Sequence, residues 1–219
     1  ELKNISHQVV CFTNPKLFSK YIVEHQNSIV INTYYGSAKA NSKALIPTIC
    51  EINSIDYVGA DSYTHMLCND KYLAKKYISD FGLNTPKGLL IRYSQGKSLN
   101  AIRLLKLPLV IKPNYGGGSN GISNKSLLYN YEEAEKWIIQ LNKYQHMPIL
   151  VEEYIPGYES EVVIFGNKNK IYFSEEIGIK INGIDYFDSQ IWGYESKKGG
   201  LHKNVLSKVD HISKKDLHK

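Results

Sequence analysis

The stretch LVIKPNYGGGSNGIS, residues 109–123, joins a short apolar run to a lysine, a proline and a loop with few side chains. Lys112 alternates with Val110 along the expected strand and points away from Leu109 and Ile111. A lysine beside the interior of a sheet needs a partner, because an unpaired buried ammonium is costly. A nucleotide phosphate would serve, and so would a structural carboxylate.

The glycine-rich loop that follows has unusual flanks for a phosphate loop. Walker A loops and dinucleotide fingerprints both precede a helix, whereas GISNKSLLY, residues 121–129, has the pattern of a return strand. The loop is therefore expected at the tip of a hairpin. Its glycine N–H groups could approach phosphate oxygens and Ser119 could add a hydroxyl, although a plain hairpin turn is an equally open interpretation.

A third segment, ILVEEYIPGYESEV at residues 149–162, is an apolar strand that runs into paired carboxylates and a turn. The extended backbone at Glu153–Ile155 could bind the edge of an adenine while Ile155 packs on the ring. Glu159 is placed to accept from ribose hydroxyls. The alternative is an amphipathic strand with solvated glutamates.

Around these segments, strands alternate with helices, which predicts an α/β fold with a partly parallel sheet. The helix at 71–80 has a cap at Asn69 or Asp70 and an apolar stripe of Leu73, Tyr77 and Ile78. We also expect helices at 16–25, 44–52, 98–107 and 131–144, strands at 8–13, 28–36, 56–60, 107–112 and 148–157, and a hairpin over 160–180 with the turn GNKN.

The composition excludes several classes of protein. The 219 residues are 42% hydrophobic and 22% charged, as in a globular chain, and no apolar run is long enough to span a bilayer. The net charge of +6 comes largely from late lysines without interleaved aromatics, which indicates a solvated face rather than a nucleic-acid surface. The three cysteines lie far apart in the sequence, which indicates reduced thiols and a cytoplasmic protein. The histidines are not spaced as zinc ligands usually are, so a zinc site is not expected.

The order of these segments resembles the ATP-grasp superfamily, most closely its D-alanine–D-alanine ligase branch. The resemblance covers roughly residues 55–190. It implies an α/β protein with α+β subdomains: a small N-terminal domain at 1–66, a small ATP-grasp subdomain with a glycine-rich lid at 67–151, and the start of a large subdomain at 152–219. It depends on Asp70-Lys71 opening a helix, Thr85-Pro86, PLVIKP at 108–113, GGGSNG at 116–121 and ILVEEYIPGYE at 149–159.

The resemblance also implies roles for individual residues. Lys71 and Lys112 would contact ATP phosphates, and Lys112 would also lie against the adenine. The loop would close over the β- and γ-phosphates, and Glu159 would hold the ribose. The expected ATP-binding residues are Lys71, Lys112, Gly117, Gly118, Ser119, Gly121, Glu152, Glu153, Tyr154, Ile155 and Glu159.

Enzymes of this family transfer the γ-phosphoryl of ATP to a carboxylate, and an amine then displaces phosphate from the acyl phosphate. The resemblance therefore predicts a ligase for small amino-acid-like carboxylate and amine substrates, with ATP and Mg²⁺ as cofactors. It predicts no nucleic-acid or membrane partner and allows a homodimer. The alternatives are D-alanine–D-alanine ligation itself, a non-catalytic nucleotide-binding module and, on charge alone, a nucleic-acid-binding α/β protein.

Three features depart from the family pattern. Gly116, Gly117, Gly118 and Ser119 stand where that branch has Glu-Gly-Ser-Ser, and Tyr186-Phe187-Asp188 match only the start of its second loop. The metal ligands are expected beyond Lys219 and no catalytic residue is assigned. We expect the chain to be cut at both ends and inactive alone.

Overall fold

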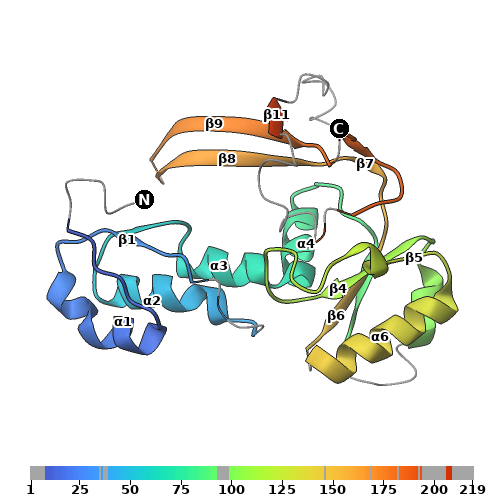
Figure 1. Ribbon diagram of the computed structural model, residues 1–219, viewed down its shortest axis with the longest axis horizontal. Coiled ribbons are helices and arrows are strands. Elements are labelled where there is room, and N and C mark those ends of the chain that lie inside the picture. Colours follow the sequence, from blue (N-terminus) through green and yellow to red (C-terminus); the bar gives the residue numbers. More distant parts are fainter. Residues whose placement is uncertain are drawn as a thin grey trace. The chain divides into compact units, whose positions relative to one another are not determined.

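The computed structural model describes residues 8–34, 36, 39–92, 99–145, 147–167, 169–181, 183–191, 193 and 206–208 (Figure 1). The chain folds as two compact units, Glu1–Gly82 and Leu83–Lys219. The domain boundaries expected after residues 66 and 151 stay predictions.

The first unit is a set of short helices beside two parallel strands, β1 and β2. The apolar residues of its second α-helix recur at helical spacing, so that Ile46, Ile49 and Cys50 share one buried face with Phe18 and Ile22. The elements of this unit are α1 (Pro15–Tyr21), η2 (Ile22–His25), β1 (Val30–Ile31), η3 (Ser42–Ala44), α2 (Leu45–Ile52), β2 (Tyr57–Val58), α3 (Ser62–Asn69) and α4 (Lys71–Asp80).

Glu51 at the end of α2 joins three elements of this unit. Its carboxylate accepts from the Tyr57 hydroxyl at 2.6 Å, the Ser62 hydroxyl at 2.6 Å and the Ser62 N–H at 2.9 Å. These bonds, the Ser62 hydroxyl first, hold the pKa of Glu51 below its usual 4.5. The carboxylate thus ties α2 and β2 to the N-terminus of α3.

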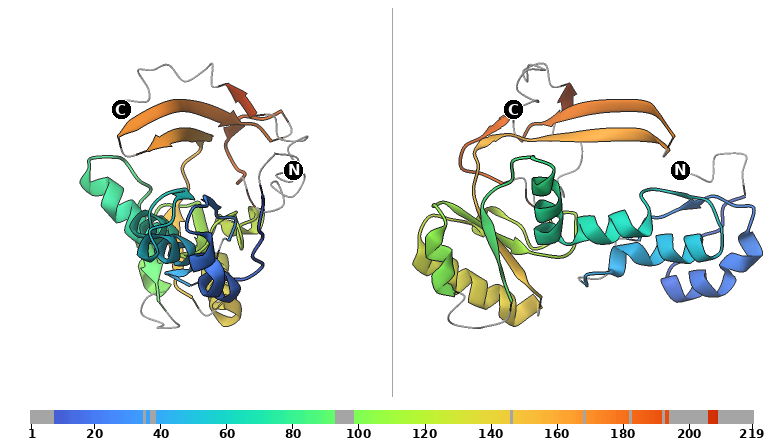
Figure 2. Two further views of the ribbon diagram at one scale, coloured as in Figure 1. Left: turned by 90° about the vertical axis from the view of Figure 1, so that its left-hand side faces the viewer. Right: turned by 180° about the vertical axis from the view of Figure 1, so that it is seen from behind.

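The second unit contains an antiparallel sheet in the order β3-β6-β4-β5 (Figure 2). Period-two alternation along β4 puts Leu109 and Ile111 in one core with Ala134 and Ile138 of α6. Val110 and Lys112 lie on the opposite face, as predicted. The elements are β3 (Gly88–Ile91), η4 (Ala101–Leu104), β4 (Leu109–Pro113), η5 (Asn124–Ser126), β5 (Leu127–Leu128), α6 (Tyr131–Gln145) and β6 (Ile149–Glu153).

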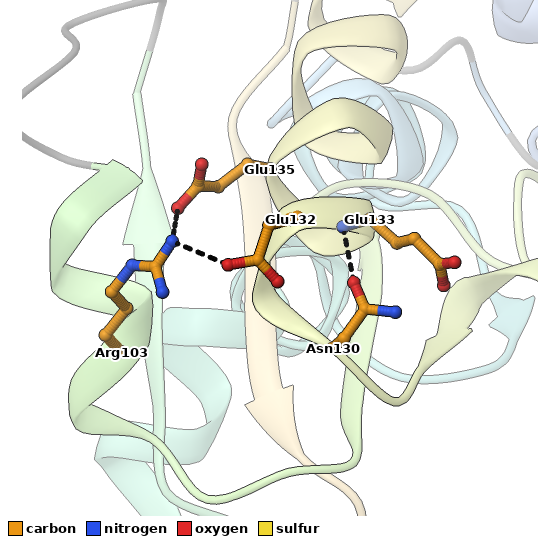
Figure 3. Close-up of polar contacts among 5 residues, drawn as sticks. All are labelled: Arg103, Asn130, Glu132, Glu133 and Glu135. Atoms are coloured by element: carbon orange, nitrogen blue, oxygen red, sulfur yellow. Dashed lines mark hydrogen bonds and ion pairs between the residues drawn. The ribbon is translucent and has the colours of Figure 1, made fainter.

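Helix α6 begins at a polar cluster that also ties it to η4 (Figure 3). Asn130 accepts from the Glu133 N–H at 2.8 Å through its side chain, which satisfies a free donor of the first turn. Arg103 of η4 donates to Glu132 at 3.2 Å and to Glu135 at 3.0 Å. These contacts hold the helix beside the sheet on the face away from Lys112.

The rest of the second unit is a long antiparallel hairpin, as predicted, with smaller paired segments. Both faces of the hairpin are apolar and solvent-exposed: Val162, Val163, Ile164 and Phe165 follow one another along β8 and are 44–67% exposed. The elements are β7 (Gly157–Tyr158), β8 (Ser160–Asn167), β9 (Lys170–Ile179), β10 (Tyr186–Phe187) and β11 (Leu206–Lys208).

Within the described part of the chain, no helix has both the length and the apolar character needed to cross a bilayer.

Candidate functional site

Lys112 and Glu152 form a close ion pair on the face of the sheet opposite α6. The register pairs Lys112 with Leu150 and Val110 with Glu152, so the two charged residues are diagonal neighbours on adjacent strands. The Nζ of Lys112 lies 2.6 Å from Oε2 of Glu152, and the side chains are 22% and 6% exposed. The partner of Lys112 in this structure is a carboxylate, which belongs to one of the residues predicted to bind ATP, and a contact of Lys112 with phosphate stays a prediction.

The end of β6 leaves part of its backbone beyond the paired strands. Glu153 N–H donates to the Lys87 carbonyl and Tyr154 N–H to the Pro108 carbonyl, both at 2.9 Å. Ile155 follows the last ladder pair and is 62% exposed. The position expected to meet an adenine edge is therefore Ile155, since the two preceding N–H groups are already used.

The side chains of Glu153 and Tyr154 hold other parts of the unit. The Glu153 carboxylate accepts a hydrogen bond at 2.9 Å from the N–H of Lys106, which precedes β4 in the chain. The Tyr154 hydroxyl lies 2.7 Å from the Phe187 carbonyl and 2.9 Å from the Gln190 carbonyl. The sequence analysis assigned a role only to the backbone of these two residues. It did not predict their side-chain contacts, because the partner groups are main-chain atoms, which carry no sequence signal.

The glycine loop connects β4 to β5 through residues 114–126, which include the helix η5. The return strand expected over 121–129 is present but shorter, since only Leu127 and Leu128 pair with β4, in the antiparallel direction. The loop is thus a long connection rather than a tight hairpin tip. The capping box at Ser123, in which Ser123 and Ser126 bond each other's backbone, starts η5 and competes with strand pairing there.

Glycine is required in this loop by backbone conformation. The φ angles are 97° at Gly116, 64° at Gly118, 56° at Ser119 and 74° at Gly121, all in the left-handed region. A Cβ at Gly116 or Gly118 would meet nothing within 4 Å, so crowding is not the reason. Ser119 adopts the same conformation at a cost that glycine would not have.

The loop and the open end of β6 lie at opposite ends of the same strand pair. Pro113 pairs with Ile149, and Leu109 pairs with Glu153, four residues along. At about 3.3 Å per residue, the two ends are about 13 Å apart. The Lys112–Glu152 pair lies between them, over a distance that an extended nucleoside triphosphate covers from base to γ-phosphate.

Two further predicted residues belong to other elements of the chain. Lys71 is the first residue of α4 in the first unit, where Asp70 caps the helix by accepting from the Leu73 N–H at 3.0 Å. Glu159 is exposed between β7 and β8, and its carbonyl accepts from Ile179 N–H at 2.9 Å. The described residues contain no group of three His, Cys, Asp or Glu side chains that could hold a metal ion. The ATP roles of all these residues stay predictions.

Solved structures share the fold of this chain. The D-alanine–D-alanine ligase from Bacillus anthracis aligns with a TM-score of 0.67 at 17% identity, covering 97% of this chain and 63% of that one. The VanG D-Ala:D-Ser ligase from Enterococcus faecalis aligns with a TM-score of 0.59 at 26% identity, covering 69% of this chain and 43% of that one. The chain therefore has the mixed helix-and-sheet fold of ATP-grasp enzymes.

Sequence comparison defines the family within that class. Residues 78–215 match the family described as D-ala D-ala ligase C-terminus, and the chain belongs to this family. The D-alanine–D-alanine ligase of Pelagibacter ubique (strain HTCC1062) is 28% identical over 182 residues, which cover 77% of this chain and 54% of the relative. That of Wigglesworthia glossinidia brevipalpis is 30% identical over 167 residues, covering 72% and 45%. The chain spans about half the length of these relatives, and the predicted resemblance is confirmed.

Proposed function

We propose that this chain supplies the nucleotide-binding part of an ATP-dependent carboxylate–amine ligase. The observation that supports this most is the position of Lys112, between a glycine loop with left-handed backbone and the open end of β6. A family match over residues 78–215 supports the same conclusion. A structural carboxylate alone would account for Lys112, but not for the conformation of the loop.

The proposed binding mode assigns each region one part of the nucleotide. Ile155 N–H and the Glu153 carbonyl meet the adenine edge, Glu159 accepts from the ribose, and Lys112 donates to the phosphates. The loop residues Gly117, Gly118, Ser119 and Gly121 close over the β- and γ-phosphates, and Lys71 of the first unit is kept as a further proposed phosphate ligand. Bound ATP would supply the phosphoryl group that activates a carboxylate, and the residues of this chain position it and offset its charge.

Lys112 would gain a second anionic partner when a nucleotide binds. In the described state its ammonium is neutralised by Glu152 at 2.6 Å. A triphosphate nearby offers a second anion, so Lys112 can bridge the phosphate and Glu152 without becoming unpaired. A preformed pair of this kind keeps the lysine extended along the sheet and reduces the ordering cost of binding.

The proposed substrates are small amino acids of D configuration. This follows from the relatives, which are D-alanine–D-alanine ligases and a D-Ala:D-Ser ligase. The proposal includes Mg²⁺ with the nucleotide, a cytoplasmic location where ATP is available, and a homodimer. We assign no described residue as a ligand of Mg²⁺.

Calorimetric titration of this chain with ATP and with GTP, both with Mg²⁺, tests the nucleotide site. ATP should bind more tightly, because guanine offers the opposite donor and acceptor pattern to the backbone at Ile155. Lys112→Ala should weaken ATP binding at least about tenfold, since a bond to a charged group is worth about 1.5–3 kcal/mol. Lys136→Ala, an exposed lysine on α6, is the matched control and should bind ATP as the parent does. Equal affinities for ATP and GTP, or an unchanged affinity in folded Lys112→Ala, would refute the assignment.

A further inference from the structure

Tyr154 makes a side-chain contact that its place in the predicted adenine pocket does not explain. Its hydroxyl lies within 2.7 Å of the Phe187 carbonyl and 2.9 Å of the Gln190 carbonyl. The hydroxyl has a single proton, so it donates to these carbonyls in turn or shares the proton between them. Either way, the hydroxyl closes the turn between Phe187 and Gln190 and holds it to the end of β6.

The same segment touches the exit of the glycine loop. The Ile191 N–H donates to the side-chain oxygen of Asn124 at 3.4 Å, a long bond. Gly193 is buried there, and a Cβ on it would lie 2.8 Å from the Ile122 carbonyl and 3.0 Å from the Ser123 Cα. Only glycine permits this backbone approach, so the contact is close as well as polar.

We propose that Tyr154 is a positioning residue that docks residues 187–191 and Gly193 against the exit of the glycine loop. The docked segment then joins the two ends of the nucleotide site, because Tyr154 precedes Ile155 and Asn124 lies in the last part of the loop. Closing of the loop over phosphates would therefore be transmitted to residues 187–193. The docking itself stands on geometry, whereas this transmission rests on the proposed nucleotide function.

The surroundings of the hydroxyl favour a permanent donor. Burial, more than any other cause, raises the pKa of Tyr154, so the phenol keeps its proton over the ordinary pH range. The nearby ionisable groups that act on it are Tyr129, Asp188 and Glu159, each of which also raises its pKa. Phe187 is independently held in an apolar cluster with Ile179 and Ile181, so loss of the hydroxyl should loosen the residues after Phe187 rather than unfold β10.

The chain contains a natural reporter for this segment. Its two tryptophans are Trp137 on α6 and Trp192, which the sequence puts between Ile191 and Gly193. A Trp137→Phe background leaves Trp192 as the sole fluorophore, and Phe suits the partly buried position of Trp137 against the core. Acrylamide quenching of Trp192 and amide hydrogen exchange over 187–193 then measure the docking without any ligand.

In this background, Tyr154→Phe should increase Trp192 quenching and speed exchange over 187–191 about fivefold, the effect of one neutral hydrogen bond. Tyr158→Phe is the matched control, because it removes a hydroxyl on the paired strand β7 and should change neither. Asn124→Ala should act in the same direction as Tyr154→Phe, more weakly because its bond is long. Unchanged quenching and exchange in folded Tyr154→Phe would overturn the docking.

Adding Mg²⁺ and a non-hydrolysable ATP analogue tests the transmission. The analogue should shift Trp192 emission in the Tyr154-containing background and not in Tyr154→Phe, even at saturation. A purely structural tyrosine would leave that response intact, which would overturn the positioning role. If the analogue binds neither protein while Tyr154→Phe still loosens the segment, the proposed nucleotide function fails and the docking stands.

Discussion

The ion pair between Lys112 and Glu152 makes a quantitative prediction about stability. Lys112→Met removes the charge but retains an unbranched apolar stem, and Glu152→Leu replaces the carboxylate by an apolar group of similar size. The two single variants and the double variant form a complete cycle. The cycle separates the interaction of the two side chains from the loss of each one.

The magnitudes follow from the two exposures. The Glu152 side chain is 6% exposed, so Lys112→Met leaves a desolvated carboxylate behind and should cost about 3 kcal/mol, the lower end for a broken buried pair. The Lys112 side chain is 22% exposed and flexible, so its ammonium can reach water in Glu152→Leu, which should cost only about 1–2 kcal/mol. The double variant leaves no unpaired charge and should cost about 1 kcal/mol or less.

Equilibrium urea unfolding, followed by the tryptophan fluorescence of the chain at neutral pH, measures all four proteins. The free energies should be strongly non-additive, with the double variant more stable than Lys112→Met. Lys136→Ala again serves as a surface control and should change the free energy of unfolding by less than about 0.5 kcal/mol. Single effects that add up to the double effect within about 0.5 kcal/mol would refute a direct interaction across the sheet.

Four further expectations concern other parts of the chain. Because the folded pKa of Glu51 is lowered, its stabilisation is present above its unfolded pKa and is lost as pH falls through the folded value; Glu51→Gln should therefore flatten the acid side of the thermal-melting profile. Residues 115–121 should gain hydrogen-exchange protection on adding an ATP analogue with Mg²⁺, and equal protection would indicate a plain loop. Gly118→Ala should lower the free energy of unfolding by about 1 kcal/mol because φ is 64°, whereas Gly157→Ala, with free space and ordinary φ, should not. Glu159→Ala should raise the ATP dissociation constant measured by calorimetry, by about 1 kcal/mol or slightly more in binding free energy.

The sequence predicted the elements that have strong internal patterns. Alternation in β4 correctly assigned Lys112 and Ile111 to opposite faces, and the helix expected at 131–144 is present as α6, with Ala134, Ile138 and Leu141 buried. The β8–β9 hairpin was predicted from two apolar runs around GNKN, of which Lys168 lies outside the described residues. These features depend on neighbours in the chain, which a single sequence displays.

Features that depend on distant residues were missed or wrong. Residues 8–13 have an apolar run but form no strand, and Val10 is 47% exposed, because a run predicts a strand only where a partner strand exists. The sheet around the site is antiparallel, and among the residues that the structure describes the parallel pairing is between β1 and β2. Glu152 was predicted near the nucleotide but not as the partner of Lys112, since cross-strand register cannot be read from one sequence.

The apolar stripe of α4 is exposed, which periodicity alone could not predict. Leu73, Tyr77 and Ile78 follow helical spacing in α4, as predicted, yet they are 40–51% exposed. Periodicity identifies which residues share a face and does not state whether that face is covered. The stripe is therefore a surface feature of the first unit.

The long hairpin affects how this chain behaves in solution. Strand β8 is at the edge of its described sheet, in the order β11-β9-β8, and the run of apolar residues along it is exposed on both sides. An edge strand of this kind offers both hydrogen-bonding groups and apolar surface to any other extended chain. Association through β8 should therefore limit the solubility of the chain, even though a net charge of +6 makes the molecules repel one another at low ionic strength. Raising the salt concentration screens that repulsion while leaving the apolar edge unchanged, so dilute, low-salt buffers are the conditions in which the isolated chain should best resist aggregation through β8.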